Sequence, residues 1–192
     1  MQECRIAARE LACRRGDRLL FRGLSLGLTA GDALHVAGAN GIGKSSLLRI
    51  LAGLLRPYAG DVDRHGAIGL IDERAALDPH LPLGTALAFW ERMDGPPGDA
   101  IARLGLSDLL DVPVRYLSTG QRKRASLARL IGQAAPIWLL DEPLNGLDTH
   151  AARLTEELAA DHCNSGGICV IASHQSFAFD RMKRLNLADF TA

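Results

Sequence analysis

The chain has 192 residues, of which 47% are hydrophobic, and its 22 basic and 22 acidic side chains give a formal net charge of zero. This composition is typical of one soluble globular domain, and the balanced charge argues against nucleic acid or an anionic membrane surface as a partner. The four cysteines have no C-x-x-C spacing, so reduced thiols are expected. The first residues lack a signal-peptide core, and no apolar run approaches the roughly 20 residues that cross a bilayer.

The first part of the chain predicts a hairpin. Apolar residues favour strands from Ile6 to Cys13 and from Arg18 to Leu28, with Gly16 in the turn between them. Short strands are also expected around Val62 and from Ile68 to Ile71, after a Pro-Gly turn. These segments predict β structure on both sides of the next motif.

Residues 38–45 match the phosphate-binding pattern G-x-x-x-x-G-K-[ST]. The apolar strand 33–37 precedes them and a helix from Lys44 to Leu54 follows, which is the context that this motif needs. Its glycines let backbone N–H groups surround phosphate oxygens at a helix start. Lys44 can neutralise phosphate charge, and the Ser45 hydroxyl can bind Mg²⁺. The predicted nucleotide-binding residues are Gly38, Ala39, Asn40, Gly41, Ile42, Gly43, Lys44, Ser45 and Ser46.

The segment from about Ala75 to Val114 contains five prolines and predicts only short helices, at 85–93 and 99–104. A small helical insertion is therefore expected there. A stronger helix is predicted from Gly120 to Gly132. Ser118 precedes it as a suitable N-cap, which makes a second helix start able to bind phosphate.

A continuous apolar strand from Ile137 to Leu140 is suited to the middle of a parallel sheet. Asp141 follows it and can hold Mg²⁺, and Glu142 can then polarise an attacking water. A helix at 150–162 and a buried strand at 168–172 come next. His174 after that strand can reach a γ-phosphate. The alternation of strands and helices predicts an α/β fold.

In this order the motifs resemble those of the ATP-binding cassette (ABC) ATPase family. The resemblance covers the whole chain and implies one domain over residues 1–192. That domain would have a P-loop NTPase core, an antiparallel β subdomain and a small α-helical subdomain at about 75–120. The matching segments are Gly38–Ser45 as Walker A, Leu117–Gln121 as signature, Ile137–Glu142 as Walker B, Asn145–Asp148 as D-loop and His174 as switch histidine.

The resemblance also implies how the site works. ATP and Mg²⁺ are the expected cofactors, with Glu142 and His174 catalytic and with Ser45 and Asp141 as metal ligands. Two copies would pair head to tail as a homodimer, so that the signature residues of one copy complete the ATP site of the other. The expected signature contacts are Ser118, Gly120 and Gln121.

Within the family, the chain is most similar to the ATPase subunit of the haem exporter of bacterial cytochrome c maturation (CcmA-type). That likeness implies an integral membrane partner subunit, a peripheral location on the cytoplasmic face of the inner membrane, and no nucleic acid. It leaves the cargo open, because no residue of this chain need touch it. The residues that carry the likeness are Leu11–Phe21, Leu77–Leu81, Leu87–Trp90 and Ser173–Gln175.

Three positions depart from the family pattern. No glutamine follows the strand at 68–71, and by spacing Glu73 or Arg74 takes its place. Thr119 replaces the first glycine of the signature, which predicts looser or shifted packing there. Arg14 or Arg15 stands where an aromatic residue often stacks on adenine. These departures make ATP binding a firmer expectation than fast turnover.

Two other functions remain open from the sequence. A soluble cassette protein of translation or DNA repair usually has two cassettes or a long coiled-coil insertion, and this chain has neither. Its basic cluster at 122–129 is better explained as a solvated helix face. A non-catalytic assembly factor clamped by ATP is compatible with the missing glutamine. If the chain serves a transporter, the helix around Trp90 is either subdomain core or a docking surface.

Overall fold

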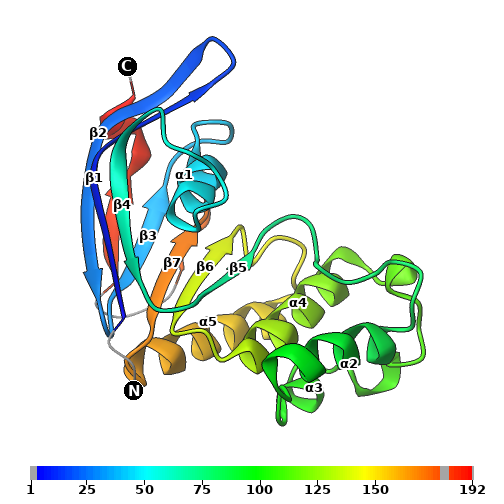
Figure 1. Cartoon of the computed structure of the whole chain (residues 1–192). Helices are drawn as coiled ribbons and strands as arrows, with labels where there is room; N and C mark the ends of the chain where they lie inside the picture. The colour runs from blue at the N-terminus through cyan, green and yellow to red at the C-terminus, as the bar shows by residue number, and fades with distance from the viewer. Residues whose placement is uncertain (1–3, 178–181, 192) are drawn as a thin grey trace.

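The computed structural model describes residues 4–177 and 182–191. It contains a three-stranded antiparallel sheet and a five-stranded parallel sheet, with a group of helices at the far end of the second (Figure 1). The strand orders are β2-β1-β4 and β5-β6-β7-β3-β8. The strands are β1 Arg5–Arg15, β2 Arg18–Thr29, β3 Ala33–Ala37, β4 Ala59–His65, β5 Ile68–Ile71, β6 Ile137–Asp141, β7 Ile168–Ala172 and β8 Lys183–Asn186.

The helices cover the parallel sheet on both faces, as an α/β fold requires. The predicted α/β fold class with a β layer and a helical part is therefore confirmed. The α-helices are α1 Lys44–Leu51, α2 Leu83–Asp94, α3 Ala100–Arg103, α4 Thr119–Gln133 and α5 Thr149–Asn164, and the short 3₁₀ helices are η1 Ser107–Leu109, η2 Val114–Tyr116 and η3 Leu187–Phe190.

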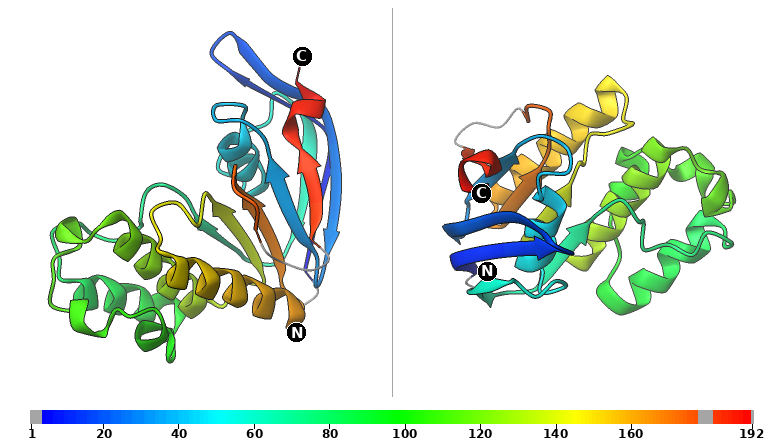
Figure 2. Two further views of the ribbon diagram at one scale, coloured as in Figure 1. Left: turned by 180° about the vertical axis from the view of Figure 1, so that it is seen from behind. Right: turned by 90° about the horizontal axis from the view of Figure 1, so that it is seen from above.

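Two hydrophobic cores hold these layers together. In one, α1 packs between the antiparallel sheet and one face of the parallel sheet, with Leu47, Leu48 and Leu51 fully buried. In the other, α2, α4 and α5 pack against the opposite face of β5, β6 and β7. Figure 2 shows α2, α3 and α4 grouped on one side of the molecule, away from the antiparallel sheet. Strands β3 and β6 lie in the interior of the five-stranded sheet, so their carboxyl ends meet at one edge.

The predicted elements differ from the observed ones mainly at their ends. Helix α1 stops at Leu51, three residues before the predicted end at Leu54, because the chain turns at Gly53 with a φ of 78°. Strand β8 was not predicted. It pairs with β3 at the sheet edge, and most of its side chains are exposed, so it lacks an apolar pattern. No helix of the described chain is long and apolar enough to span a membrane.

Candidate nucleotide-binding and hydrolysis site

The loop between β3 and α1 has the shape that its glycines predict. Gly38, Gly41 and Gly43 have φ angles of 150°, 75° and 120°, which other residues rarely adopt. A Cβ on Gly43 would lie 3.3 Å from atoms of Leu20 and Phe21, so the loop also packs closely on β2. The sequence therefore fixes a tight backbone curl at the start of α1.

Lys44 lies inside this curl. Its side chain is only 6% exposed, and its Nζ donates to the carbonyl oxygens of Gly38 at 2.7 Å and Ala39 at 3.2 Å. A buried ammonium group needs such partners, because burial without them is costly. The lysine thus places a positive charge at the centre of the loop, where phosphate oxygens would bind.

A cavity of about 440 Å³ opens over the loop. Gly41, Lys44 and Ser45 line it on the loop side, and Glu73 and Glu142 line it from neighbouring segments. Its size lies within the range of small-molecule sites. The structure therefore brings most of the predicted Walker A residues and the predicted base into one cavity.

Asp141 ends β6 beside Ser45 and is 4% exposed. Burial, more than any other cause, raises the pKa of its carboxyl group, and the negative charges of Glu142 and Glu73 add to the rise, while a hydrogen bond from Ser45 opposes it. Its Oδ1 atom is buried and has no hydrogen-bond partner among the described residues. Hydroxyl and carboxylate oxygens are the ligands that Mg²⁺ prefers. The unpartnered oxygen next to Ser45 therefore fits a Mg²⁺ ion.

Glu142 contacts both Lys44 and the predicted histidine, His174. Its Oε1 lies 3.5 Å from Lys44 Nζ, and its Oε2 lies 2.9 Å from His174 Nδ1. The backbone is in the left-handed region, with a φ of 46°, which is strained for a residue other than glycine. Hydrogen bonds hold this conformation, since Glu142 N–H donates to Ala172 at 2.8 Å and Lys123 Nζ contacts the Glu142 carbonyl. The carboxylate is therefore held facing the cavity.

Of the two residues that by spacing could take the place of the missing glutamine, Glu73 is the one that lines the cavity. Arg74 is absent from the residues that line it. The segment is anchored at Asp72, whose Oδ2 forms an ion pair with Arg49 Nη2 at 3.1 Å and whose Oδ1 accepts from the Arg74 N–H at 3.0 Å. A carboxylate from this segment therefore lines the cavity.

The signature segment starts α4 with a complete capping box. Ser118 Oγ accepts from the Gln121 N–H at 3.2 Å, and Gln121 Oε1 accepts from the Ser118 N–H at 2.7 Å. Ser118, Gly120 and Gln121 do not line the described cavity over the Lys44 loop. The two predicted phosphate-binding helix starts therefore remain separate within one chain.

Close packing explains the glycine of the signature. A Cβ on Gly120 would lie 2.5 Å from the carbonyl oxygen of Gly146 in the D-loop. The Thr119 side chain also packs against Gly146. A Cβ added to Gly146 would lie 3.3 Å from Thr119 Cγ2. The threonine that replaces the usual glycine is therefore accommodated beside the D-loop, which continues to Asp148, the N-cap of α5.

We expect Gly120→Ala to destabilise the fold by about 1–3 kcal/mol, because the new methyl group overlaps a backbone oxygen. Urea unfolding of the purified protein measures the change. Gly27→Ala is the matched control, since a Cβ there meets nothing within 4 Å. Equal stabilities of the two variants would contradict the close contact.

The basic cluster on α4 is not a solvated face, and that interpretation was wrong. Lys123 contacts the Glu142 carbonyl, and burial, the main cause, lowers the pKa of its ammonium group. Arg122 and Arg124 donate to the carbonyls of Leu117 and Leu104, and the Arg129 guanidinium lies 3.7 Å from the centroid of the Trp90 ring. Sequence reasoning missed Lys123 because its partner lies 19 residues away.

The chain matches the family model described as ABC transporter over residues 21–145. It is 63% identical over 190 residues to the cytochrome c biogenesis ATP-binding export protein CcmA of Novosphingobium aromaticivorans, covering 99% of both chains. The CcmA protein of Zymomonas mobilis is 50% identical, with 98% of this chain and 86% of that protein covered.

A solved structure described as an ABC transporter ATP-binding protein of Pyrococcus furiosus superposes with a TM-score of 0.84, covering 98% of this chain and 100% of that one. At 21% identity this likeness supports the fold alone. The fold, the site and the relatives agree, and the chain belongs to the ABC transporter ATP-binding family, among the CcmA-type export ATPases of cytochrome c biogenesis.

Proposed function

We propose that this chain hydrolyses ATP, with Mg²⁺ as cofactor, to power a separate membrane subunit that exports or handles haem in cytochrome c biogenesis. One observation carries the chemistry: the Glu142 carboxylate lies between Lys44 and His174 at the wall of the cavity, next to buried Asp141. The names of the relatives support the biological role. The cavity residues support hydrolysis rather than ATP binding alone.

Each group of residues has its own proposed role in ATP binding and hydrolysis. Loop N–H groups and Lys44 bind the phosphates, and Lys44 exchanges its carbonyl partners for phosphate oxygens. Ser45 and Asp141 would hold Mg²⁺, which neutralises charge on the β- and γ-phosphates when bound. Glu142 orients a water molecule for in-line attack and accepts its proton, while His174 holds the Glu142 carboxylate and faces the γ-phosphate.

The separation of the two phosphate-binding helix starts supports a head-to-tail homodimer. Ser118 and Gly120 lie outside the cavity that contains Lys44. In the dimer, Ser118 and the N-terminus of α4 from one copy complete the ATP site of the other. The unit that forms this site would be one domain over residues 1–192, with the helical part at about 75–120 moving as the dimer closes and reopens.

Helix α2 offers the best surface for the membrane subunit, although Trp90 itself is not part of it. Trp90 Nε1 donates to the Ala76 carbonyl at 2.6 Å, and its ring packs on Arg129. Phe89 and Met93, one turn apart, are 48% and 65% exposed. Two large apolar side chains at helical spacing suit a protein partner. Docking there would place the protein peripherally, at the cytoplasmic face of the inner membrane.

We expect Phe89→Ser combined with Met93→Ser to reduce co-purification with the membrane subunit at least about fivefold, because the interface loses two apolar contacts. ATP binding should stay unchanged, since neither residue lines the cavity. Leu54→Ser is the control, because Leu54 is 69% exposed outside α2. Equal recovery of the double variant and the control would exclude this docking surface.

Complementation tests the proposed function as a whole. In a strain lacking the gene, the wild-type chain should restore haem-stained holo-cytochrome c, and Glu142→Gln should not. Export of the apo-protein should be normal in every strain. Restoration by Glu142→Gln would instead favour an assembly factor that binds ATP without hydrolysing it.

A further inference from the structure

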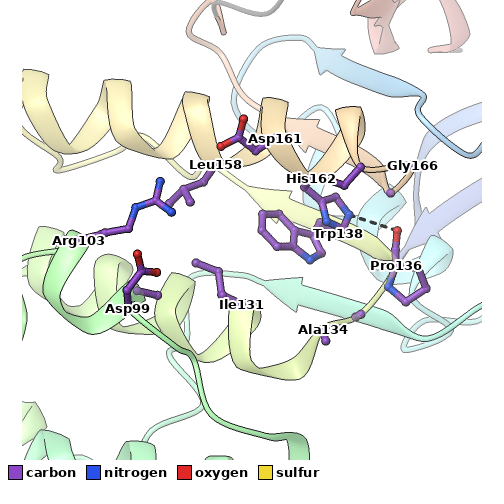
Figure 3. Close-up of a pocket in the computed structure, with 14 residues that line it drawn as sticks. Asp99, Arg103, Ile131, Ala134, Pro136, Trp138, Leu158, Asp161, His162 and Gly166 are labelled. Carbon is purple, nitrogen blue, oxygen red and sulfur yellow. Dashed lines mark hydrogen bonds between the residues drawn. The ribbon is translucent and has the colours of Figure 1, made fainter. Parts of the chain in front are cut away.

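Strand β6, which leads to Glu142, is firmly placed along its whole length. It pairs with β5 on one side and with β7 on the other. At its start, Trp138 stacks on His162 of α5 with ring centroids 4.0 Å apart, and His162 Nε2 lies 3.2 Å from the Pro136 carbonyl oxygen (Figure 3). The strand ends at Asp141, and the backbone turns into the left-handed region at Glu142. The direction of the Glu142 carboxylate is therefore set by the contacts of Glu142 itself.

Three hydrogen bonds of the described chain hold the Glu142 backbone. Its N–H donates to the Ala172 carbonyl of β7 at 2.8 Å. Its carbonyl oxygen accepts from the Asn145 N–H at 3.3 Å and from Lys123 Nζ. Among these three contacts, only that of Lys123 comes from a side chain and from a helix, α4. A left-handed residue other than glycine persists only where its surroundings hold it, so Lys123 is one of the supports of this strained peptide.

Lys123 is itself half-buried and held in place. It borders a small apolar space that Ile71 of β5 and Leu140 of β6 also line. Burial, the main cause, lowers the pKa of the Lys123 ammonium group, while the negative charges of Glu142 and Asp141 oppose that fall. Lys123 does not line the cavity over the nucleotide loop. It therefore contacts Glu142 from outside the cavity, where it has no access to a bound nucleotide.

We propose that Lys123 is a positioning residue for ATP hydrolysis, which holds the catalytic base Glu142 of its own copy from the signature helix α4. This inference rests on the proposed function. The Lys123 ammonium group fixes the Glu142 carbonyl, and the left-handed peptide directs the carboxylate into the cavity. There Oε1 lies 3.5 Å from Lys44 Nζ and Oε2 lies 2.9 Å from His174 Nδ1. A displacement of about 1 Å in a reacting group can lower the rate about 100-fold, so the contact matters for the chemical step.

The charge of Lys123 has a second possible effect, which an experiment must separate from positioning. The ammonium group lies close enough to Asp141 to interact with its charge. Removal of a positive charge beside a metal ligand strengthens Mg²⁺ binding by electrostatics alone. Loss of positioning instead lowers kcat and leaves the affinity for Mg²⁺ and for ATP unchanged. The two effects therefore differ in what they change.

Lys123→Met tests the proposal, because methionine suits the apolar surroundings but cannot donate. We expect kcat to fall about 10–100-fold, while KM for ATP and the half-saturating Mg²⁺ concentration stay within about threefold. Lys123→Arg keeps a charged donor and should retain at least about a third of the wild-type kcat. Lys183→Met is the matched control, since Lys183 is 54% exposed. Equal kcat in Lys123→Met and the control, equal losses in the methionine and arginine variants, or a changed Mg²⁺ dependence with normal kcat would overturn the proposal.

A double variant shows whether Lys123 acts through Glu142. Glu142→Gln has no base to orient, so adding Lys123→Met should lower its residual rate by less than about twofold. A further fall as large as in the wild-type background would overturn the proposal. The thermal midpoint of Lys123→Met should stay within about 4 °C of the wild type. A larger drop with normal kcat would leave Lys123 a structural role only. A wild-type rate in Glu142→Gln alone would reject the proposed hydrolysis mechanism, so the two failures are distinguishable.

Discussion

Replacement of Glu142 by glutamine should lower the rate of ATP hydrolysis by about 10²–10⁴-fold, the range for loss of a general base. Glutamine keeps the size of the side chain and an oxygen that can accept from His174, but it cannot take a proton from water. ATP affinity should stay within about threefold, because the proposed phosphate contacts come from the loop and Lys44, which line the cavity and are unchanged by the substitution. Phosphate release and equilibrium binding, measured on the same preparation, separate the two effects.

The control for this variant is Glu157→Gln, which makes the same chemical change on an exposed face of α5. It should hydrolyse ATP at the wild-type rate. With hydrolysis blocked, ATP should also hold Glu142→Gln as a dimer, which size-exclusion chromatography would detect. A Glu142→Gln protein that hydrolyses ATP within threefold of the wild type would remove Glu142 from the role of base.

The sequence predicted which residues meet at the candidate nucleotide site, because the segments that form it are short and local. The loop at Gly38–Ser45 and the acids at Asp141 and Glu142 each directly follow a buried strand. Parallel strands end at one edge, so these segments had to meet there. The observed contacts of Lys44 with Glu142 and of Glu142 with His174 follow from that topology.

Features that depend on distant partners could not be predicted in the same way. Strand β8 has no apolar alternation, because an edge strand exposes most of its side chains. The sequence around Lys123 predicts a surface residue, because the Glu142 carbonyl that it contacts lies 19 residues away. The stacked pair Trp138 and His162 joins β6 to the end of α5, and no motif marks it.

Contacts with distant parts of the chain also accompany two departures from the family pattern. Glu73 rather than Arg74 lines the cavity, and the adjacent Asp72 pairs with Arg49 from α1. Thr119 fits because Gly146 has no side chain to oppose it. In both cases the neighbouring residue, Arg49 or Gly146, comes from another part of the chain.

Replacement of Lys44 by methionine should weaken ATP binding by about 100-fold or more, equivalent to roughly 2.7 kcal/mol. Methionine keeps most of the volume and removes the charge that is proposed to bind the phosphates. The loop backbone should survive, since its shape comes from glycines with φ angles that the substitution does not alter. Calorimetric titration with a non-hydrolysable ATP analogue and Mg²⁺ measures the loss.

The same substitution also separates two roles for Lys44, binding the phosphates and holding the fold of the loop. Lys44 Nζ lies 3.5 Å from Glu142 Oε1, while Lys123 contacts the Glu142 backbone carbonyl. Lys183→Ala is the matched control, because it removes a lysine that is 54% exposed and pairs with Asp32 at 2.7 Å. That surface pair is worth at most about 1 kcal/mol and should not affect ATP binding. If Lys44→Met bound ATP as tightly as Lys183→Ala, the buried ammonium group would serve the fold of the loop rather than the phosphates.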